Sequence, residues 1–272
     1  MNAVIECRGA PRDLGRDQGR ACRRAVARRF AAGTAWERLR WRAGWPRGPE
    51  ARCVRDLWRH FPHQADRLAG LGSAAGVPAS WLAPRVLAEG GAEAAAVVLE
   101  GPPARLGRAL EAPFVVRRSR PEGLFASVEV TRPWLPAALV GVNERGLAVA
   151  SVAGPAADEH CAAPAWLLAQ DCLERFEAVG PALDWCCERP GGGGGALLLV
   201  HADGDAAGIA FGATRRVLPG AECIVRGEDA AALEKALGDV APDAAGLARA
   251  LDGAAVDAGA LRLYVGGSAF SP

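Results

Sequence analysis

The 272-residue sequence lacks any long run of apolar residues, although half of its residues are hydrophobic. No apolar run approaches the ~18 residues that a membrane-spanning helix requires. At the N-terminus a short apolar stretch precedes the charged residues, which is the reverse of the order in a signal peptide. These features predict a cytoplasmic protein that does not contact the membrane.

Lysine is almost absent, because Lys235 is the only one and arginine carries nearly all of the positive charge. The net charge of +1 gives the chain no general attraction to nucleic acid or to membranes. Residues 1–60 nevertheless contain 15 Arg and only 6 acidic residues, a bias that can indicate nucleic-acid binding. The region has none of the usual aromatic-interleaved motifs. We therefore interpret it as a set of Arg-rich amphipathic helices and expect no nucleic-acid partner.

The eight cysteines form no CxxC pair, and a chain of this length does not need a disulfide scaffold. Most of them adjoin apolar residues, which predicts small core side chains. His60 and His63 are three residues apart, a spacing that suits one helical face. However, Pro62 separates them and no second pair of ligands follows, so the sequence predicts neither a metal site nor a cofactor.

The hydrophobic period changes near residue 90. Before it, apolar residues at helical spacing predict helices over 11–31 and 50–70, and a short one that starts at Pro78. The glycines from Gly70 to Gly76 predict a turn. Later helices are predicted over 164–188, with a break near Gly180-Pro181, and over 228–238 and 243–251.

Short apolar or alternating segments predict strands over 94–99, 105–110, 124–130 and 261–265, and hairpins over 139–152 and 197–211. Asn143 to Gly146 and Asp203-Gly204 are their turns. Grouped helices and grouped strands predict an α+β layered fold with largely antiparallel sheets. We expect a single domain over 1–272, with a helical region at 1–90 and a sheet core at 91–272.

Several segments resemble the acyl-coenzyme A:6-aminopenicillanate acyltransferase family of N-terminal-nucleophile hydrolases. The opening segment from Gly9 to Gly19 is similar to the family pattern G-x-P-x-x-x-G-x-x-x-G. The segments 70–78, 141–149 and 263–267 resemble its G-I-A-x-G-A-G-V segment, its G-x-N-x-x-G-L-A-V hairpin and its closing strand. The resemblance implies a four-layer αββα sandwich of two antiparallel sheets covered by helices.

In this family the precursor cuts itself before a cysteine, whose thiolate and freed α-amine then perform acyl transfer or amide hydrolysis. The resemblance places that position at Glu93 or Ala94, and no Cys, Ser or Thr occurs between Trp81 and Arg118. The supporting Asn-x-Asp element of the family becomes Ala109-Leu-Glu111. Asn143 matches the family's oxyanion position, although an ordinary turn residue is an equally good interpretation. The sequence therefore predicts a protein without self-cleavage and without an intact catalytic site.

Besides the nucleic-acid binding discussed above, two functions remain open from the sequence. A non-catalytic relative would bind a small acylated or peptide-like ligand or a protein partner. An active acyltransferase or amide hydrolase would need a displaced nucleophile such as Cys7 or Cys161, or acid–base chemistry by Glu93 and Glu111. The early tryptophans, Trp36, Trp41, Trp45 and Trp58, indicate either core packing or a surface for a protein partner or a homo-oligomer.

Overall fold

The computed structural model describes most of the chain and both of its ends apart from the first residues. The described ranges are 4–31, 49–88, 96–99, 105–110, 112–153, 164–189, 195–211, 216–219, 244–250, 253–265 and 268–272. The predicted helix over 228–238, together with Trp36, Trp41, Trp45 and Cys161, lies outside these residues.

The larger of two sheets has eight strands in the order β1-β4-β5-β6-β7-β8-β9-β10. Its strands are β1 (Ile5–Gly9), β4 (Val115–Pro121), β5 (Ser127–Thr131), β6 (Val140–Asn143), β7 (Leu147–Ala153), β8 (Gly195–His201), β9 (Ala206–Phe211) and β10 (Arg216–Pro219). All neighbours are antiparallel except β1, which runs parallel to β4. This single parallel pair adds a strand from the region that was expected to be only helical.

The smaller sheet has five antiparallel strands in the order β13-β12-β11-β3-β2. Its strands are β2 (Ala96–Leu99), β3 (Arg105–Ala109), β11 (Gly253–Asp257), β12 (Arg262–Val265) and β13 (Ser268–Phe270). The two sheets bury a shared apolar layer. Val128 and Val142 of the large sheet pack in it with Leu106 and Val256 of the small one.

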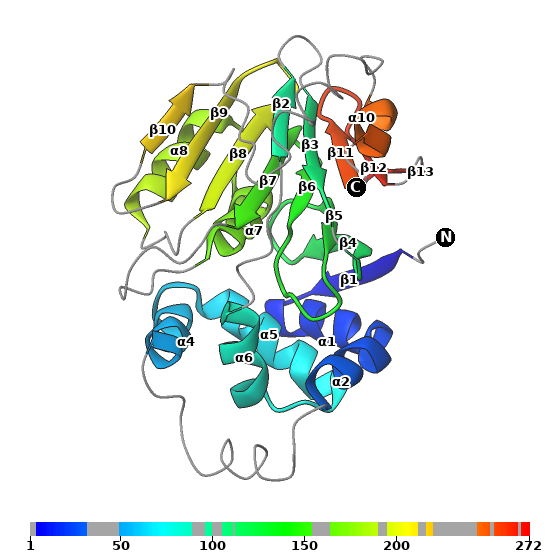
Figure 1. Cartoon of the computed structure of the whole chain (residues 1–272), viewed down its shortest axis with the longest axis vertical. Helices are drawn as coiled ribbons and strands as arrows, with labels where there is room; N and C mark the ends of the chain where they lie inside the picture. The colour runs from blue at the N-terminus through cyan, green and yellow to red at the C-terminus, as the bar shows by residue number, and fades with distance from the viewer. Residues whose placement is uncertain are drawn as a thin grey trace.

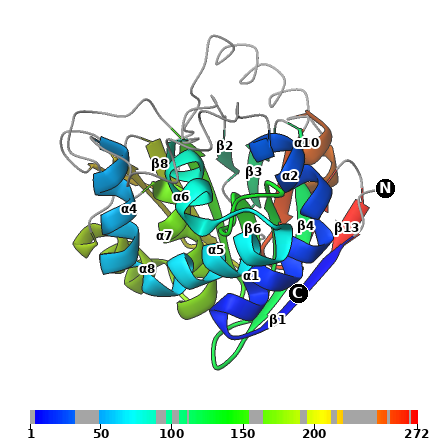
Figure 2. The same cartoon turned by 90° about the horizontal axis from the view of Figure 1, so that it is seen from below.

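Among the described helices, α1 (Pro11–Ala21) packs directly on β1 and β4 of the large sheet, α7 (Ala165–Arg175) on β6, β7 and β8, and α8 (Val179–Glu188) on β8 and β9. The helices α2 (Arg23–Ala31), α4 (Pro49–His60), α5 (Pro62–Ala75) and α6 (Ala79–Ala88) pack mainly on other helices. The five from the first 90 residues gather below the strands in Figure 1 and lie in front of them in Figure 2. α10 (Ala244–Ala250) packs on β11, β3 and β12 of the small sheet.

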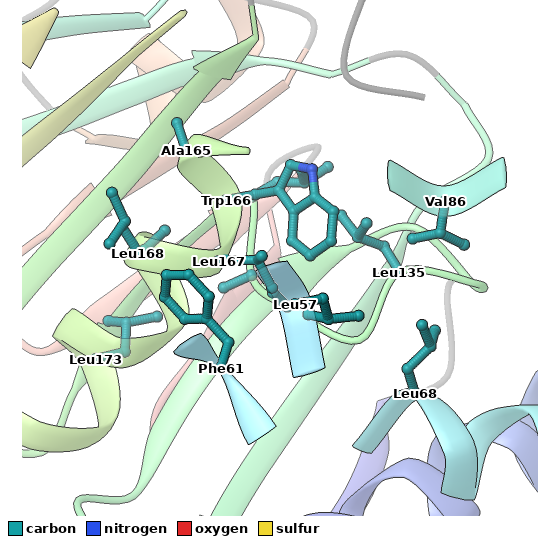
Figure 3. Packing of buried hydrophobic residues seen from close by; sticks show 14 of the residues in the cluster. Leu57, Phe61, Leu68, Val86, Leu135, Ala165, Trp166, Leu167, Leu168 and Leu173 are labelled. Carbon is teal, nitrogen blue, oxygen red and sulfur yellow. The ribbon is translucent and has the colours of Figure 1, made fainter. Parts of the chain in front are cut away.

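A second apolar core joins the large sheet to these helices. This core contains Leu57 of α4, Phe61 directly after α4, and Leu68 of α5. They pack with Trp166, Leu167 and Leu168 of α7, as Figure 3 shows. α7 is buried along almost its whole length, because it lies between the sheet and the helices of the first 90 residues. The side chains of α7 are therefore held from both sides.

Two glycine-rich faces bring α1 and α5 into close contact. A Cβ added at Gly15 would lie 1.9 Å from the backbone oxygen of Arg67, and one at Gly70 would lie 2.0 Å from that of Arg12. The predicted turn over 70–76 is therefore wrong for most of its length. Its glycines continue α5 because they permit this contact, and only Gly76, with a φ of 78°, ends the helix.

Two long helices were predicted without a break, and a third was predicted with its break a few residues too late. The helix over 11–31 divides at Cys22, and the one over 50–70 divides at Phe61, directly before Pro62. The helix over 164–188 breaks after Arg175, and Gly180-Pro181 lies instead in the first turn of α8, where proline is tolerated.

Both predicted hairpins are confirmed as β6–β7 and β8–β9, with Gly146 and Gly204 at positive φ in their turns. The helix from Pro78 and the strand pair β2–β3 are also confirmed. The strand over 261–265 exists but β13 follows it. β1, β4, β10 and β11 were not predicted either. Within the described ranges, no helix has the length and apolar character needed to cross a membrane.

We expect Gly15→Ala to lower the free energy of unfolding by about 3 kcal/mol, because the added methyl group would push α1 away from the backbone of α5. Urea denaturation measures this loss. Gly180→Ala is the matched control, since a Cβ there meets nothing within 4 Å and should leave stability unchanged or raised by a few tenths of a kcal/mol. Equal effects of the two substitutions would contradict the packing argument.

Candidate functional site

Arg108 is a buried arginine on the face of the small sheet that meets the large one. It is two residues from Leu106, which points into the layer between the sheets, and it pairs across the strands with Ala254 and Ala96. Side chains two apart on a strand share a face. The guanidinium thus enters an otherwise apolar layer, beside the first residue of β2, with only 6% of the residue exposed.

The Arg108 guanidinium has unsatisfied hydrogen-bond donors. Its Nε and Nη1 are buried and contact no acceptor among the described residues. Burial, together with the nearby charge of Arg132, lowers the pKa of Arg108 to about 9, so the group still carries its charge at neutral pH. Arg132 follows the end of β5 in the opposite sheet. Two cationic side chains therefore converge where the sheets face each other.

Arg108 lies in the sequence between the predicted site positions 93 and 111. The structure describes only some of these positions. Ala109 ends β3 opposite Gly253 and, as the neighbour of Arg108, points to the other face of the sheet. Glu93, Ala94 and Glu111 lie outside the described residues. The proposal of acid–base chemistry by Glu93 and Glu111 stays a prediction.

Asn143 is fully buried at the end of β6, on the helix side of the large sheet. Its Nδ2 donates to the backbone oxygens of Leu173 and Phe176. Its Oδ1 accepts from the backbone N–H groups of Arg145 and Leu147. These four hydrogen bonds use the whole capacity of the amide, so in this arrangement Asn143 fixes the hairpin turn to the end of α7 and has no donor left for a ligand.

Cys7 is the described cysteine that was considered as a displaced nucleophile. It is fully buried on β1, and burial raises the pKa of its thiol to about 11 despite the charges of Arg117 and Arg67. A thiol that stays protonated at neutral pH is a poor nucleophile. This environment favours the interpretation of Cys7 as a core residue.

A buried polar network occupies the opposite, helix-facing side of the large sheet. At its centre, Arg117 of β4 donates from Nε at 2.8 Å to Glu129 Oε2 on β5 and from Nη2 to the same oxygen. Its Nη1 donates to Gln18 Oε1 of α1 at 2.5 Å, and Nη2 to Gln170 Oε1 of α7 at 2.9 Å. Every nitrogen of this guanidinium is paired, in contrast to Arg108.

A second ion pair extends the network to α5. Arg67 Nη1 donates to Glu174 Oε1 of α7 at 2.6 Å, and Nη2 donates to Ser119 Oγ of β4 at 3.0 Å. Gln170 Nε2 joins the two halves by donating to both Glu129 and Glu174. The network therefore binds three helices to two strands.

The two buried carboxyl groups of the network have pKa shifts of opposite sign. Burial opposes the ionisation of Glu129, but Arg117, Arg67 and the hydrogen bonds from Ser127 and Gln170 outweigh it and lower its pKa to about 2. Burial raises the pKa of Glu174, because Arg67 compensates it less completely and Asp171 and Glu129 add negative charge.

Sequence reasoning missed Arg108 and the whole network. One signal for Arg108 was present, because a single arginine interrupts the small and apolar residues of the strand at 106–110. The network gave no signal, since its members are distributed from Gln18 to Glu174 and only the tertiary structure brings them together.

Proteins similar to this chain are found among solved structures. No protein-family model and no curated protein matches the sequence. Among solved structures, penicillin V acylase from Agrobacterium tumefaciens aligns with a TM-score of 0.35 and 16% identity, over 54% of this chain and 56% of that one. A mutant conjugated bile acid hydrolase from Clostridium perfringens aligns with a TM-score of 0.34 and 14% identity, over 55% and 60%. The similarity is distant and structural.

The chain is a mixed α+β protein with two sheets. The aligned part spans little more than half the length of either solved structure.

We expect Glu129→Gln to lower the free energy of unfolding at pH 7 by about 3–5 kcal/mol, because it leaves the buried Arg117 without its counter-charge. Urea denaturation measures the change. The control is Glu122→Gln, the same substitution at an exposed position, which should alter stability by less than about 0.5 kcal/mol. An equally small effect at Glu129 would contradict the central place of this ion pair.

Acid should weaken the fold through Glu129. Its folded pKa of about 2 is below its ordinary value of 4.5, so the ionised form stabilises the protein fully above pH 4.5. That contribution is lost as the pH falls from 4.5 towards 2. The urea midpoint should therefore fall more steeply over this range in the wild type than in Glu129→Gln, and parallel curves would argue against it.

Proposed function

We propose that this protein is a non-catalytic relative of the penicillin-acyltransferase-type N-terminal-nucleophile hydrolases, and that it binds a small acylated or peptide-like molecule through the carboxylate of that ligand. On this proposal the two sheets and their covering helices are the four-layer αββα sandwich of that class. The observation that carries the proposal is the unpaired, buried guanidinium of Arg108 between the sheets.

A buried arginine without an acceptor costs stability, because its N–H groups have lost water and gained no partner. A carboxylate supplies the two parallel acceptors that a guanidinium binds best, and charge-assisted hydrogen bonds are the strong ones. An acyl chain or an apolar side chain of the ligand would lie against the valines and leucines of the same layer. These properties together suit an acylated amino acid or a short peptide with a free carboxyl end.

Two observations support the non-catalytic part of the proposal. The sequence from 82 to 117 contains no Cys, Ser or Thr that could act as the self-cleaving residue. The described alternative nucleophile, Cys7, is buried and has a raised pKa. The competing function, acyl transfer or amide hydrolysis with a displaced nucleophile, requires a reactive side chain elsewhere.

Intact-mass analysis of the purified protein tests whether the chain is processed. We expect one species of about 28.2 kDa, the mass of the full sequence. Incubation with an acyl-amide substrate and a thiol-reactive acyl probe should release no amine and label no cysteine stoichiometrically. Two fragments divided near residue 93, or stoichiometric labelling, would favour the active alternative.

Arg108→Met tests ligand binding and stability together. The substitution removes an unpaired buried charge, so we expect the free energy of unfolding to rise by about 1–3 kcal/mol. Binding of N-octanoylglycine, followed by calorimetry, should weaken by about 10- to 100-fold, in keeping with the ~1.5–3 kcal/mol of a charge-assisted hydrogen bond.

Two controls accompany this experiment. Arg120→Met makes the same change at an exposed position of β4 and should leave binding unchanged. The glycinamide form of the ligand, which has no carboxylate, should bind weakly to the wild type and to Arg108→Met alike. A loss of stability in Arg108→Met, with no difference between the two ligands, would show that Arg108 is structural.

A further inference from the structure

A histidine and two carboxylates converge between α5 and α7, away from the layer that holds Arg108. His63 is in the first turn of α5, and Asp171 and Glu174 lie one helical turn apart on α7. One potential ligand atom from each residue lies within 4.8 Å of those of the other two. His63 Nε2 and Asp171 Oδ1 are 2.5 Å apart.

The second observation is a pair of buried oxygens that lack hydrogen-bond donors. Asp171 is 1% exposed, and its Oδ2 has no partner among the described residues. Gln64, the neighbour of His63, is fully buried, and its Oε1 also has no partner among the described residues. The Nε2 of Gln64 lies 3.5 Å from Asp171 Oδ1. A buried carboxylate oxygen without a donor is costly unless a cation or proton satisfies it.

The charges around the cluster favour a cation. The connected buried groups comprise three carboxylates, Glu129, Asp171 and Glu174, against two guanidiniums, Arg67 and Arg117. The carboxyl groups therefore outnumber the guanidinium groups by one, and a neutral imidazole is the form that binds a metal. Arg67 and Gln170 already orient the Glu174 carboxylate, as outer partners orient metal ligands.

We propose that His63, Asp171 and Glu174 form a binding site for a divalent transition-metal ion such as Zn²⁺, with the Gln64 amide oxygen or a water molecule completing the coordination. Bonds of about 2.1 Å to nitrogen and oxygen place the ligand atoms of one tetrahedral ion roughly 3.4 Å apart. His63 Nε2 and Asp171 Oδ1, now 2.5 Å apart, therefore have to separate when the ion binds. The His63 side chain is 19% exposed, so it has room to move and gives the ion a route from solvent.

This site differs from the one that the sequence rejected. His60 and His63 were considered as a pair on one helix, but α4 ends at His60 and α5 begins at Pro62. The partners of His63 come instead from α7, 108 and 111 positions further along the chain. The inference is independent of the proposed ligand at Arg108, because the two sites lie on opposite faces of the large sheet.

Calorimetry of the full chain with ZnCl₂, after removal of metal with EDTA, tests the site. We expect one ion bound per chain, a higher melting temperature with Zn²⁺, and a loss of affinity of at least tenfold in His63→Ala. His60→Ala, a histidine three residues away, is the matched control and should bind as the wild type does. Asp171→Asn should also lose affinity, and its circular dichroism reports whether it folds.

Co²⁺ as a second probe separates this site from the eight cysteines. We expect visible absorption bands of a nitrogen and oxygen ligand set, without the intense near-ultraviolet bands of cobalt–thiolate bonds, and their loss in His63→Ala. The proposal is overturned if the wild type binds neither ion, if His63→Ala binds both as the wild type does, or if thiolate bands accompany binding. In the first case the remaining explanation is an imidazolium–carboxylate pair between His63 and Asp171.

Discussion

The guanidinium of Arg117 joins elements that the chain brings together from distant positions. It binds Glu129 on the neighbouring strand, Gln18 on α1 and Gln170 on α7, and is itself fully buried. Burying a charge is costly unless it is paired and its hydrogen-bonding groups are satisfied. This condition fixes where both helices lie on the large sheet, because moving either of them would leave a buried donor without an acceptor. The ion pair of Arg67 and Glu174 extends the same constraint to α5.

The contact between α1 and α5 is the steric counterpart of this electrostatic constraint. Glycines on both helices let the two backbones approach until no side chain fits between them. Arg67 belongs to the same part of α5, and its backbone oxygen is the atom that faces Gly15. The close approach therefore places the Arg67 side chain over Ser119 and Glu174, so that packing and ion pairing depend on one another.

Arg108 and Arg117 show two outcomes for a buried arginine in one protein. Both enter the interior from a strand, but Arg117 finds acceptors on every nitrogen and Arg108 finds none among the described residues for Nε and Nη1. On the proposed function, the guanidinium of Arg108 lacks acceptors because it is held ready for an anionic ligand. A preformed anion site carries its positive charge before the ligand binds. The same reasoning applies with the opposite sign to Asp171, whose Oδ1 contacts His63 while its Oδ2 has no partner among the described residues.

Local patterns in the sequence determined the elements whose residues interact with near neighbours. The hairpins at 139–152 and 197–211 follow from alternating residues around a turn, and the α+β class follows from the grouping of helices and strands. The continuation of α5 through Gly70 was not predictable in this way, because its close contact with α1 decides it. The candidate site was predicted in sequence as positions 93–111, which lack a nucleophile, together with Asn143. The tertiary structure decided that Nε and Nη1 of Arg108 have no acceptor among the described residues, that Asn143 has no free donor and that His63 meets Asp171. Such contacts depend on how the layers pack and leave no periodic trace in the chain.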